Sequence, residues 1–298
     1  MSGGGRQNWK NMQRVVRREL LDDVENDTES RHSATAVEDY LSEKLKEINN
    51  LDYEAINAHR DSIENALGKE FEIERMSFAG SHARRTDVDE FSDIDLLATF
   101  RSKSDLPNSS DEAVALLAKR LRERFPRTSI ETGDMAVTVK FTDGLRVQVL
   151  PAYREGNTFR IPDVNSAGWK YSNPTAHARR LREINENSGR QVLSTVKLAK
   201  QLFDRNGIGL KSYHIENMAL KAFEHYSGPF SNRNMLRHLI NRSKSLVHQR
   251  IADRAGQTAD VSDYLTRNDR IQISKKLARL EATLKSDSLD NWRESFDT

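Results

Sequence analysis

The sequence predicts an α+β protein in which a core of strands and helices lies between an N-terminal helical arm and a C-terminal helical lobe. Short β-rich runs gather between about residues 70 and 165, whereas helical spacing of apolar residues fills both flanks. Glycine and proline number only 14 and 6 in 298 residues, which favours helices over a turn-rich all-β fold. We therefore expect an arm over residues 1–60, a core over 61–170 and a helical domain over 171–298.

The arm is expected to consist of helices. Apolar residues recur at helical spacing in three stretches, Trp9–Asp23, Ala36–Ile48 and Tyr53–Leu67, and this spacing is typical of amphipathic helices. The segment Asn26–His32 is rich in Asp, Glu, Ser and Thr, a composition that predicts a loop after the first helix.

The core carries strand signals on both sides of one helix. Apolar runs and alternation predict the strands, Pro126 ends the helix, and Thr142–Gly144 is a hairpin turn signal. The expected strands are Phe71–Phe78, Ile94–Phe100, Ala136–Phe141 and Leu145–Leu150, and the expected helix is Ala113–Phe125.

The C-terminal lobe is predicted to be helical throughout, because amphipathic spacing returns after Asn173. One helix is expected to begin at Pro174, and the others to span Gln191–Phe203, Ser212–His225, Asn234–Ile251 and Arg270–Leu284.

Composition excludes several classes of function. The chain has no cysteine, which excludes disulfides, cysteine-ligated zinc, iron–sulfur clusters and cysteine nucleophiles. Its 47 basic and 45 acidic residues leave a net charge of +2, which argues against a protein that wraps duplex DNA. We recognise neither a signal peptide nor an apolar run long enough to span a membrane, so we expect a cytoplasmic protein without membrane contact.

One segment of the core combines two features that suit phosphate and metal chemistry. Gly80–Ser81 follows a predicted strand; glycine allows close backbone approach to a ligand, and backbone N–H groups bind phosphate well where a helix begins. Asp93 and Asp95 stand two positions apart at the start of the next strand, so their side chains point to the same face. In the absence of cysteine and paired histidines, two carboxylates suit a hard cation, foremost Mg²⁺.

These residues resemble the signature of the polymerase-β nucleotidyltransferase superfamily, in which Gly-Ser is followed by Asp-x-Asp. The segment Leu145–Tyr153 resembles the third-strand motif of its oligoadenylate-synthase-like and bacterial CD-NTase (SMODS) branch. The resemblance extends over about residues 60 to 225. Further segments similar to this branch are Ile161–Pro162, Gly168–Lys170, Ser172–Pro174, Leu198–Phe203, Asn206–Gly207 and Ser212–Glu216.

The resemblance implies a polymerase-β-like lobe with a central mixed sheet, and an enzyme that joins nucleotides from NTPs or dNTPs with release of pyrophosphate. The product would be a cyclic or linear oligonucleotide signal in bacterial antiphage defence, acting with an effector protein. Asp93 and Asp95 would hold Mg²⁺, with Mn²⁺ as a substitute. The residues implied in binding the triphosphate are Gly80, Ser81, Lys197, Lys200 and Ser212.

One position departs from the branch pattern. A third acidic residue is usual where this chain has Gln148, and in the family this acid helps hold a metal and deprotonate the attacking hydroxyl. Glutamine carries no charge and cannot act as a base. Three explanations stay open: an active variant with two acids, a degenerate enzyme, or a residue changed from the natural one. Asp134 and Asp143 are the other acids near this point of the sequence.

Two further functions remain in view. Gln148 raises the alternative of a catalytically weak or inactive nucleotide-binding module that acts through a partner protein, and the same core also occurs in transferases that modify tRNA or protein. A basic series in the C-terminal lobe indicates a possible oligonucleotide or nucleic-acid ligand, although charged helix faces are usually only solvated. The series comprises Arg233, Arg237, Arg242, Lys244, Arg250 and Arg254.

Overall fold

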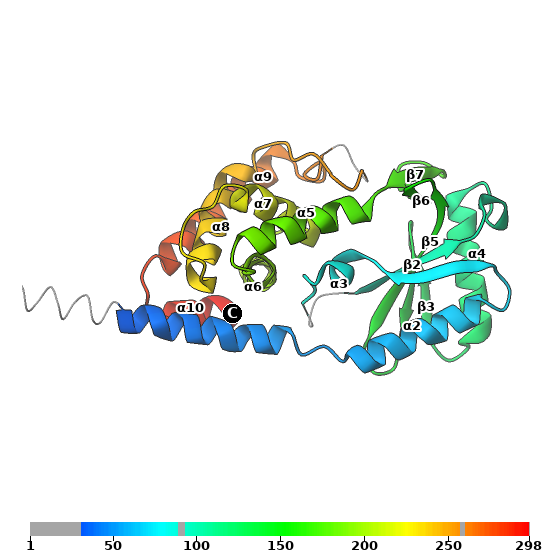
Figure 1. Ribbon diagram of the computed structural model, residues 1–298, viewed down its shortest axis with the longest axis horizontal. Coiled ribbons are helices and arrows are strands. Elements are labelled where there is room, and N and C mark those ends of the chain that lie inside the picture. Colours follow the sequence, from blue (N-terminus) through cyan, green and yellow to red (C-terminus); the bar gives the residue numbers. More distant parts are fainter. Residues whose placement is uncertain (1–30, 89–92, 257–259, 298) are drawn as a thin grey trace, which may run out of the picture.

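The computed structural model describes residues 31–88, 93–256 and 260–297 and shows two bodies of different architecture (Figure 1). One is built around a mixed sheet and the other only from helices, as the sequence predicts. The predicted helix Trp9–Asp23 lies outside the described residues. Of the predicted loop Asn26–His32, only Arg31 and His32 are described, and both lie in a helix over residues 31–48 rather than in a loop.

The sheet has seven strands with a parallel pair at its centre. Its order is β1-β2-β5-β4-β3, and β6 and β7 continue from β5 as antiparallel neighbours. β2 and β5 run parallel, whereas β1 with β2, β4 with β5 and β3 with β4 are antiparallel. The strands are β1 (Ile73–Phe78), β2 (Ile94–Phe100), β3 (Ser129–Thr132), β4 (Val137–Lys140), β5 (Arg146–Glu155), β6 (Thr158–Pro162) and β7 (Trp169–Ser172).

The two faces of the sheet have different surroundings. α2 (Tyr53–Leu67) and α4 (Ser110–Arg124) pack against one face, where alternate strand residues such as Leu96 and Val149 enter the larger core of this body. The intervening residues point to the other face, where Leu97 belongs to a small apolar cluster. That second face is the one that faces the helical lobe.

The helical lobe contains most of the remaining helices and one continuous hydrophobic core. Trp292 and Phe296 of the last helix are fully buried in it. The helices are α5 (Pro174–Asn187), α6 (Val192–Arg205), α7 (Ser212–Phe223), α8 (Asn232–Leu246), α9 (Arg267–Leu284) and α10 (Leu289–Asp297). None of the helices in the described ranges is both long and apolar enough to cross a lipid bilayer.

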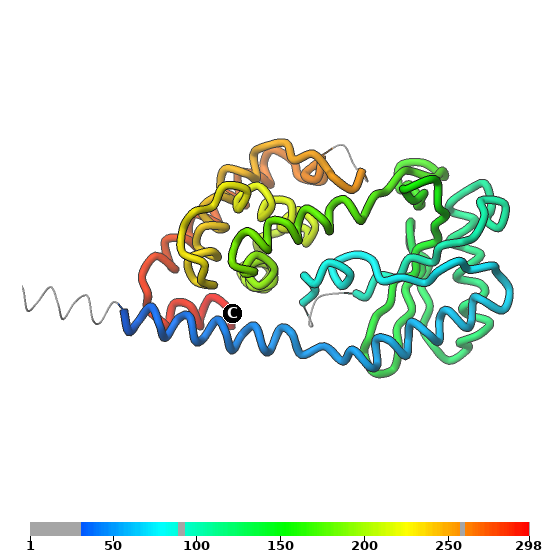
Figure 2. The backbone as a smooth tube through the Cα atoms, viewed as in Figure 1, coloured from blue at the N-terminus to red at the C-terminus, as the bar shows by residue number. Residues whose placement is uncertain are grey.

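The N-terminal helices connect the two bodies. Figure 2 shows the helix over 31–48 and α2 following one another along one side of the molecule. Val37 and Leu41 of the first helix are buried in the core of the helical lobe, whereas Ile56 and Ile63 of α2 are buried against the sheet. The arm therefore contributes to both hydrophobic cores; the domain boundaries at 60 and 170 stay a prediction.

Candidate active site

The turn after β1 is built around a glycine that no other residue can replace without strain. α3 (Gly80–Arg84) begins directly at Gly80, whose φ is +56°. A Cβ at this position would lie 1.6 Å from Oδ2 of Asp95. Gly80 is therefore required both by its left-handed backbone and by the carboxylate packed against it.

We expect Gly80→Ala to lower the nucleotide transfer that the sequence resemblance implies by about 100-fold, because displacing a catalytic group by about 1 Å costs this much. The substitution has to push the Asp95 carboxylate away. Gly144→Ala is the matched control, since Gly144 also has a positive φ, +92°, but no atom within 4 Å of the added Cβ. Product formation and thermal melting measure both effects. Equal activity of the two variants would contradict this account of Gly80.

Two carboxylates and Gln148 come together where β2 and β5 run side by side. Asp95 of β2 and Gln148 of β5 are direct neighbours in the parallel pair. Asp93 lies just before β2, and its Oδ2 accepts a hydrogen bond of 2.5 Å from Nε2 of Gln148. Its Oδ1 lies 3.0 Å from Nε of Arg146. Gln148, for whose position the resemblance implies a third acid, thus holds Asp93 by donating a hydrogen bond.

The Asp95 carboxylate lies in an environment that favours binding of a cation. Burial raises its pKa to about 6, with Arg84 opposing the shift and Asp93 adding to it. Within the part of the chain that the structure describes, no hydrogen bond or ion pair reaches this carboxylate. A largely desolvated, unpaired carboxylate beside a second one is a costly arrangement, and a bound cation would relieve that cost.

The side chains around Asp95 offer few ligands for a metal ion. In the described ranges no group of three or more His, Cys, Asp or Glu side chains is placed to hold a metal. The available ligands are the carboxylates of Asp93 and Asp95 and the amide of Gln148. Mg²⁺ is commonly bound by one or two protein carboxylates together with substrate phosphates, so the residues fit a cation that arrives with a nucleotide.

A cavity of about 280 Å³ opens in front of these residues, between the sheet and the helical lobe. Gly80, Asp95 and Gln148 line it from the core. His177 and Tyr213 line it from the helical lobe. The remaining lining is largely apolar and includes Leu97, Met135, Leu150, Phe159, Ile161 and Pro174. A small apolar cavity with a few convergent polar groups is typical of a ligand site.

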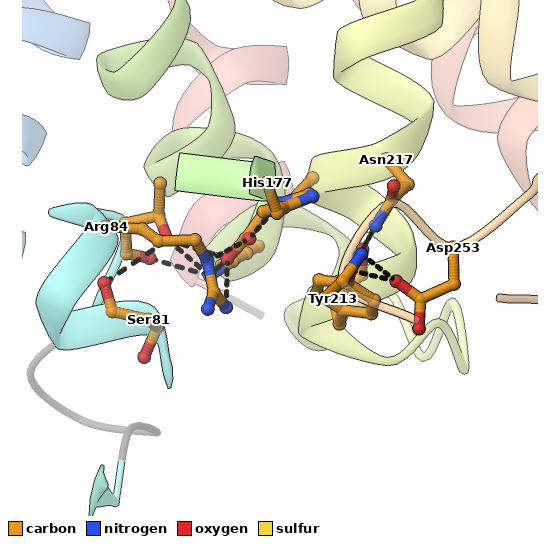
Figure 3. A network of polar contacts seen from close by, with 10 residues as sticks. Ser81, Arg84, His177, Tyr213, Asn217 and Asp253 are labelled. Atoms are coloured by element: carbon orange, nitrogen blue, oxygen red, sulfur yellow. Dashed lines mark hydrogen bonds and ion pairs between the residues drawn. The ribbon is translucent and has the colours of Figure 1, made fainter. Parts of the chain in front are cut away.

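Beside the cavity lies a buried polar network that sequence reasoning missed; Figure 3 labels Arg84 and His177 in it, and Glu216 is the residue to which both bind. Its carboxylate is fully buried and accepts from Nε of Arg84 at 2.6 Å and from Nζ of Lys200 at 2.9 Å. The hydroxyl of Thr86 donates at 2.6 Å, and Nε2 of His177 lies 3.1 Å away. Burial alone would raise the pKa of Glu216, but Lys200 and Arg84 outweigh it and hold that pKa well below its usual range.

The network joins the two bodies, because Arg84 comes from α3 and Glu216 from α7. Arg84 also lies over the ring of Tyr213, 5.5 Å from its centre, and the Tyr213 hydroxyl donates to Asp253 at 2.5 Å. The Nδ1 atom of His177 is buried without a hydrogen-bond partner. Glu216 stands among apolar residues of a predicted helix. This position in the sequence indicates a buried carboxylate that requires hydrogen-bond or ion-pair partners.

The residues predicted to bind the triphosphate do not all reach the cavity. Gly80 lines it, but Ser81, Lys197, Lys200 and Ser212 do not. Lys200 is held by Glu216, while Nζ of Lys197 donates to Asn49 at 2.7 Å. Ser212 is exposed in the first turn of α7. The geometry therefore gives the predicted phosphate contacts of these lysines and of Ser212 no support, because the buried acids Glu216 and Asp87 and the exposed amide of Asn49 hold the lysines.

The other acids near the hairpin also lie away from the cavity. Oδ2 of Asp143 lies 2.6 Å from Nε2 of His59, at the end of the β4–β5 hairpin. Asp134 lines a separate surface depression. Neither takes the place of the missing third acid, and the cavity has Asp95 as its acidic lining residue.

A paired-carboxylate strand beside a glycine turn, facing a helical lobe across a cavity, defines a nucleotidyltransferase of the polymerase-β type. Residues 35–185 match the profile of the Second Messenger Oligonucleotide or Dinucleotide Synthetase (SMODS) domain. The chain belongs to this family, whose members are CD-NTase nucleotidyltransferases, and the resemblance seen in the sequence is confirmed. No curated protein sequence matches the chain.

Solved structures share the fold at low sequence identity. CdnC of Escherichia coli MS115-1 with ATP matches with a TM-score of 0.69 and 18% identity, over 90% of this chain and 98% of that one. The cyclic AMP-GMP synthase DncV of Vibrio cholerae gives 0.62 and 15%, over 99% and 91%. CdnG of Bradyrhizobium diazoefficiens with GTP gives 0.62 and 14%, over 82% and 89%. The predicted α+β fold with a central mixed sheet is thereby confirmed.

Proposed function

We propose that this protein is a Mg²⁺-dependent nucleotidyltransferase that joins nucleotides from NTPs or dNTPs, releases pyrophosphate and makes a cyclic or linear oligonucleotide signal. The observation that carries the proposal is the unpaired Asp95 carboxylate, packed on Gly80 and neighboured by Asp93, at the floor of the cavity. Mn²⁺ has the same preference for oxygen ligands and is proposed as a substitute.

In the proposed reaction, the protein positions the substrate and compensates its charge. Asp93 and Asp95 would hold the metal, which supplies charge neutralisation at the reacting phosphate when bound. Gln148 orients Asp93 through its hydrogen bond. Arg84 uses Nε and Nη2 on Glu216, and its third nitrogen, at the edge of the cavity, is proposed to contact a phosphate oxygen.

The test is incubation of the full chain with labelled NTPs and dNTPs, with Mg²⁺, Mn²⁺ or EDTA, alone and with candidate activators. We expect an oligonucleotide and pyrophosphate in the presence of a metal, and neither with EDTA. The mass of the product separates cyclic from linear species, and would also reveal transfer to tRNA or protein. Absence of any nucleotide product under all these conditions would contradict the proposal.

A second candidate function, a nucleotide-binding module without catalysis, is favoured by one observation, the glutamine beside Asp95. The two candidates separate in Gln148→Asp, with Gln148→Asn as a neutral control of the same size. We expect wild-type protein to form product, and Gln148→Asp to reach half-maximal rate at about tenfold lower Mg²⁺, because a third carboxylate attracts the cation. Gln148→Asn should not show this gain. Product formed by Gln148→Asp alone would instead support the binding module.

The wider setting of the proposed enzyme is bacterial antiphage defence with an effector protein, in keeping with a family of second-messenger synthetases. One of the similar structures is a complex of CdnC with a HORMA protein, so a regulatory protein partner is also within the proposal. Nucleic-acid binding by the C-terminal basic series is less well supported, because Arg233 and Arg237 are paired with Asp287 and Lys244 with Glu281.

A further inference from the structure

A second cavity, of about 500 Å³, lies where the N-terminal helices, α3 and the start of α6 meet. Its lining shares no residue with that of the nucleotide cavity. Three parts of the chain that are distant in sequence supply its walls. The lining residues are Asn49, Tyr53, His82, Arg85, Asp87, Arg190, Leu193, Ser194 and Lys197.

The charge of this second cavity is unbalanced. Among the described lining residues, Arg85, Arg190 and Lys197 accompany one acid, Asp87. That acid is already engaged: Nδ1 of His82 lies 2.7 Å from it, and Nζ of Lys197 lies 3.4 Å from it. The guanidinium groups of Arg85 and Arg190 are exposed and make no hydrogen bond or ion pair with the side chains that the structure describes. Within residues 31–88, 93–256 and 260–297, neither guanidinium group therefore has a carboxylate partner.

Backbone groups add to the positive character. Leu193 and Ser194 stand in the first turn of α6, a helix of 14 residues whose N-cap Gln191 offers no side-chain cap. The N–H of Leu193 already donates to Oδ1 of Asn185 at 3.1 Å, so this helix end contributes its dipole, which favours an anion. The two arginines and this helix end therefore line one open cavity from different elements. Lys197 adds positive charge to the lining, although its ammonium already donates to Asn49 and Asp87.

We propose that the second cavity is a binding site for a small phosphate-class anion, with pyrophosphate as its probe. Arginine forks match the oxygens of a phosphate in a bidentate manner, and the volume accommodates more than one phosphate group. The anion would bridge Arg85, at the end of α3, to Arg190, in the turn between α5 and α6. Anion binding here goes beyond the proposed function and does not depend on it, whereas the regulatory role argued next rests on the proposed function.

The site would be coupled to the active site through a very short element. α3 spans only Gly80–Arg84, so Gly80 packs on Asp95 at one end while Arg85 closes the helix at the other. An anion that fixes Arg85 against the helical lobe would fix the position of α3. The coupling makes this a regulatory site in the proposal rather than a second substrate site.

The arginines allow a test that separates binding from folding. Arg85 and Arg190 have φ of 59° and 63°, a region in which glycine is relaxed and other residues are strained. Arg85→Gly/Arg190→Gly therefore removes both guanidinium groups without adding backbone strain. Arg127→Gln, in the exposed turn after α4, removes one charge elsewhere and is the control.

Binding of pyrophosphate to the full chain is measured in EDTA by calorimetry and by the rise in melting temperature that a bound ligand causes. We expect the double variant to melt no lower than wild type without ligand, and its Kd to be raised about tenfold or more. Arg127→Gln should bind as wild type does. Equal binding by the double variant, or tighter binding of citrate than of pyrophosphate by wild type, would overturn the proposal.

Discussion

Asp95→Asn is expected to lower nucleotide transfer by about 1000-fold or more and, in the same protein, to stabilise the metal-free fold at neutral pH. Loss of activity follows because the amide removes a negative charge from the site that would hold the cation, and one electrostatic contact in an active site is commonly worth 100- to 1000-fold. The gain in stability follows from the desolvated state of the carboxylate. Opposite signs in the two measurements distinguish a functional carboxylate from a structural one.

The stability effect has a defined pH dependence. The pKa of Asp95 is about 6 in the folded protein against 3.8 as its ordinary value, so the folded state binds the proton more tightly than the unfolded chain. The stabilising contribution of the neutral carboxyl is full below pH 4 and is lost as pH rises to 6. Above that, the charged carboxylate destabilises the fold by about 2–3 kcal/mol, and the asparagine variant escapes this loss.

Urea unfolding in EDTA at pH 4.5 and pH 8 measures this difference. The gap in the free energy of unfolding between Asp95→Asn and wild type should widen from small at pH 4.5 to about 2–3 kcal/mol at pH 8. Asp143→Asn serves as the control, because His59 lowers the pKa of Asp143 against the opposing effect of burial, and its removal should not stabilise. A wild type that is the more stable at pH 8 would refute this account of Asp95.

The sequence could place the two proposed metal-binding acids because the direction of their side chains depends on strand periodicity. Asp93 and Asp95 are two residues apart, and a strand that begins at Ile94 turns both to one face. Gln148 is expected near them because the resemblance implies a third acid at its position, and the pairing of Asp95 with Gln148 agrees. Gly80 was expected from its turn, although its contact with Asp95 required the three-dimensional structure.

Lys197 and Lys200 show that helical periodicity does not predict which groups a helix face contacts. Lys197 and Lys200 share one face of α6, but the sequence does not say which groups that face meets. Glu216 and Asp87 meet it, from elements 16 and 110 residues away respectively. A buried acid binds a nearby ammonium strongly because water is excluded, so both lysines are engaged by protein groups, and their contact with a triphosphate stays a prediction.

The helices and strands likewise fall into those that the sequence predicts and those that it does not. The bounds of α2 and β2 agree with the prediction, because both are marked by apolar spacing over their whole length. β5 continues past the predicted Leu150 to Glu155, where pairing with β6 extends it. β3, β6, β7 and α10 were not expected; the strands are only four or five residues long and depend on sheet partners rather than on local pattern.

Glu216→Gln is expected to be the most destabilising single change in the helical lobe, at about 3–5 kcal/mol, because it leaves buried cations without their counter-charge. Glu216 is fully buried and binds both Arg84 and Lys200. Burial lowers the pKa of Lys200 while Glu216 opposes that shift. Without the acid, two desolvated cations would face one another across the junction of the two bodies.

The same reasoning predicts a rescue. In Glu216→Gln/Lys200→Met one of the two cations is gone, so the double variant should regain about half of the lost free energy of unfolding in urea. Glu281→Gln is the matched control, since Glu281 pairs with Lys244 in a partly exposed position, and it should cost less than about 1 kcal/mol. If Lys200→Met only adds its own loss to that of Glu216→Gln, the network is held by packing rather than by charge, and Arg84 needs no acid to stay at the edge of the cavity.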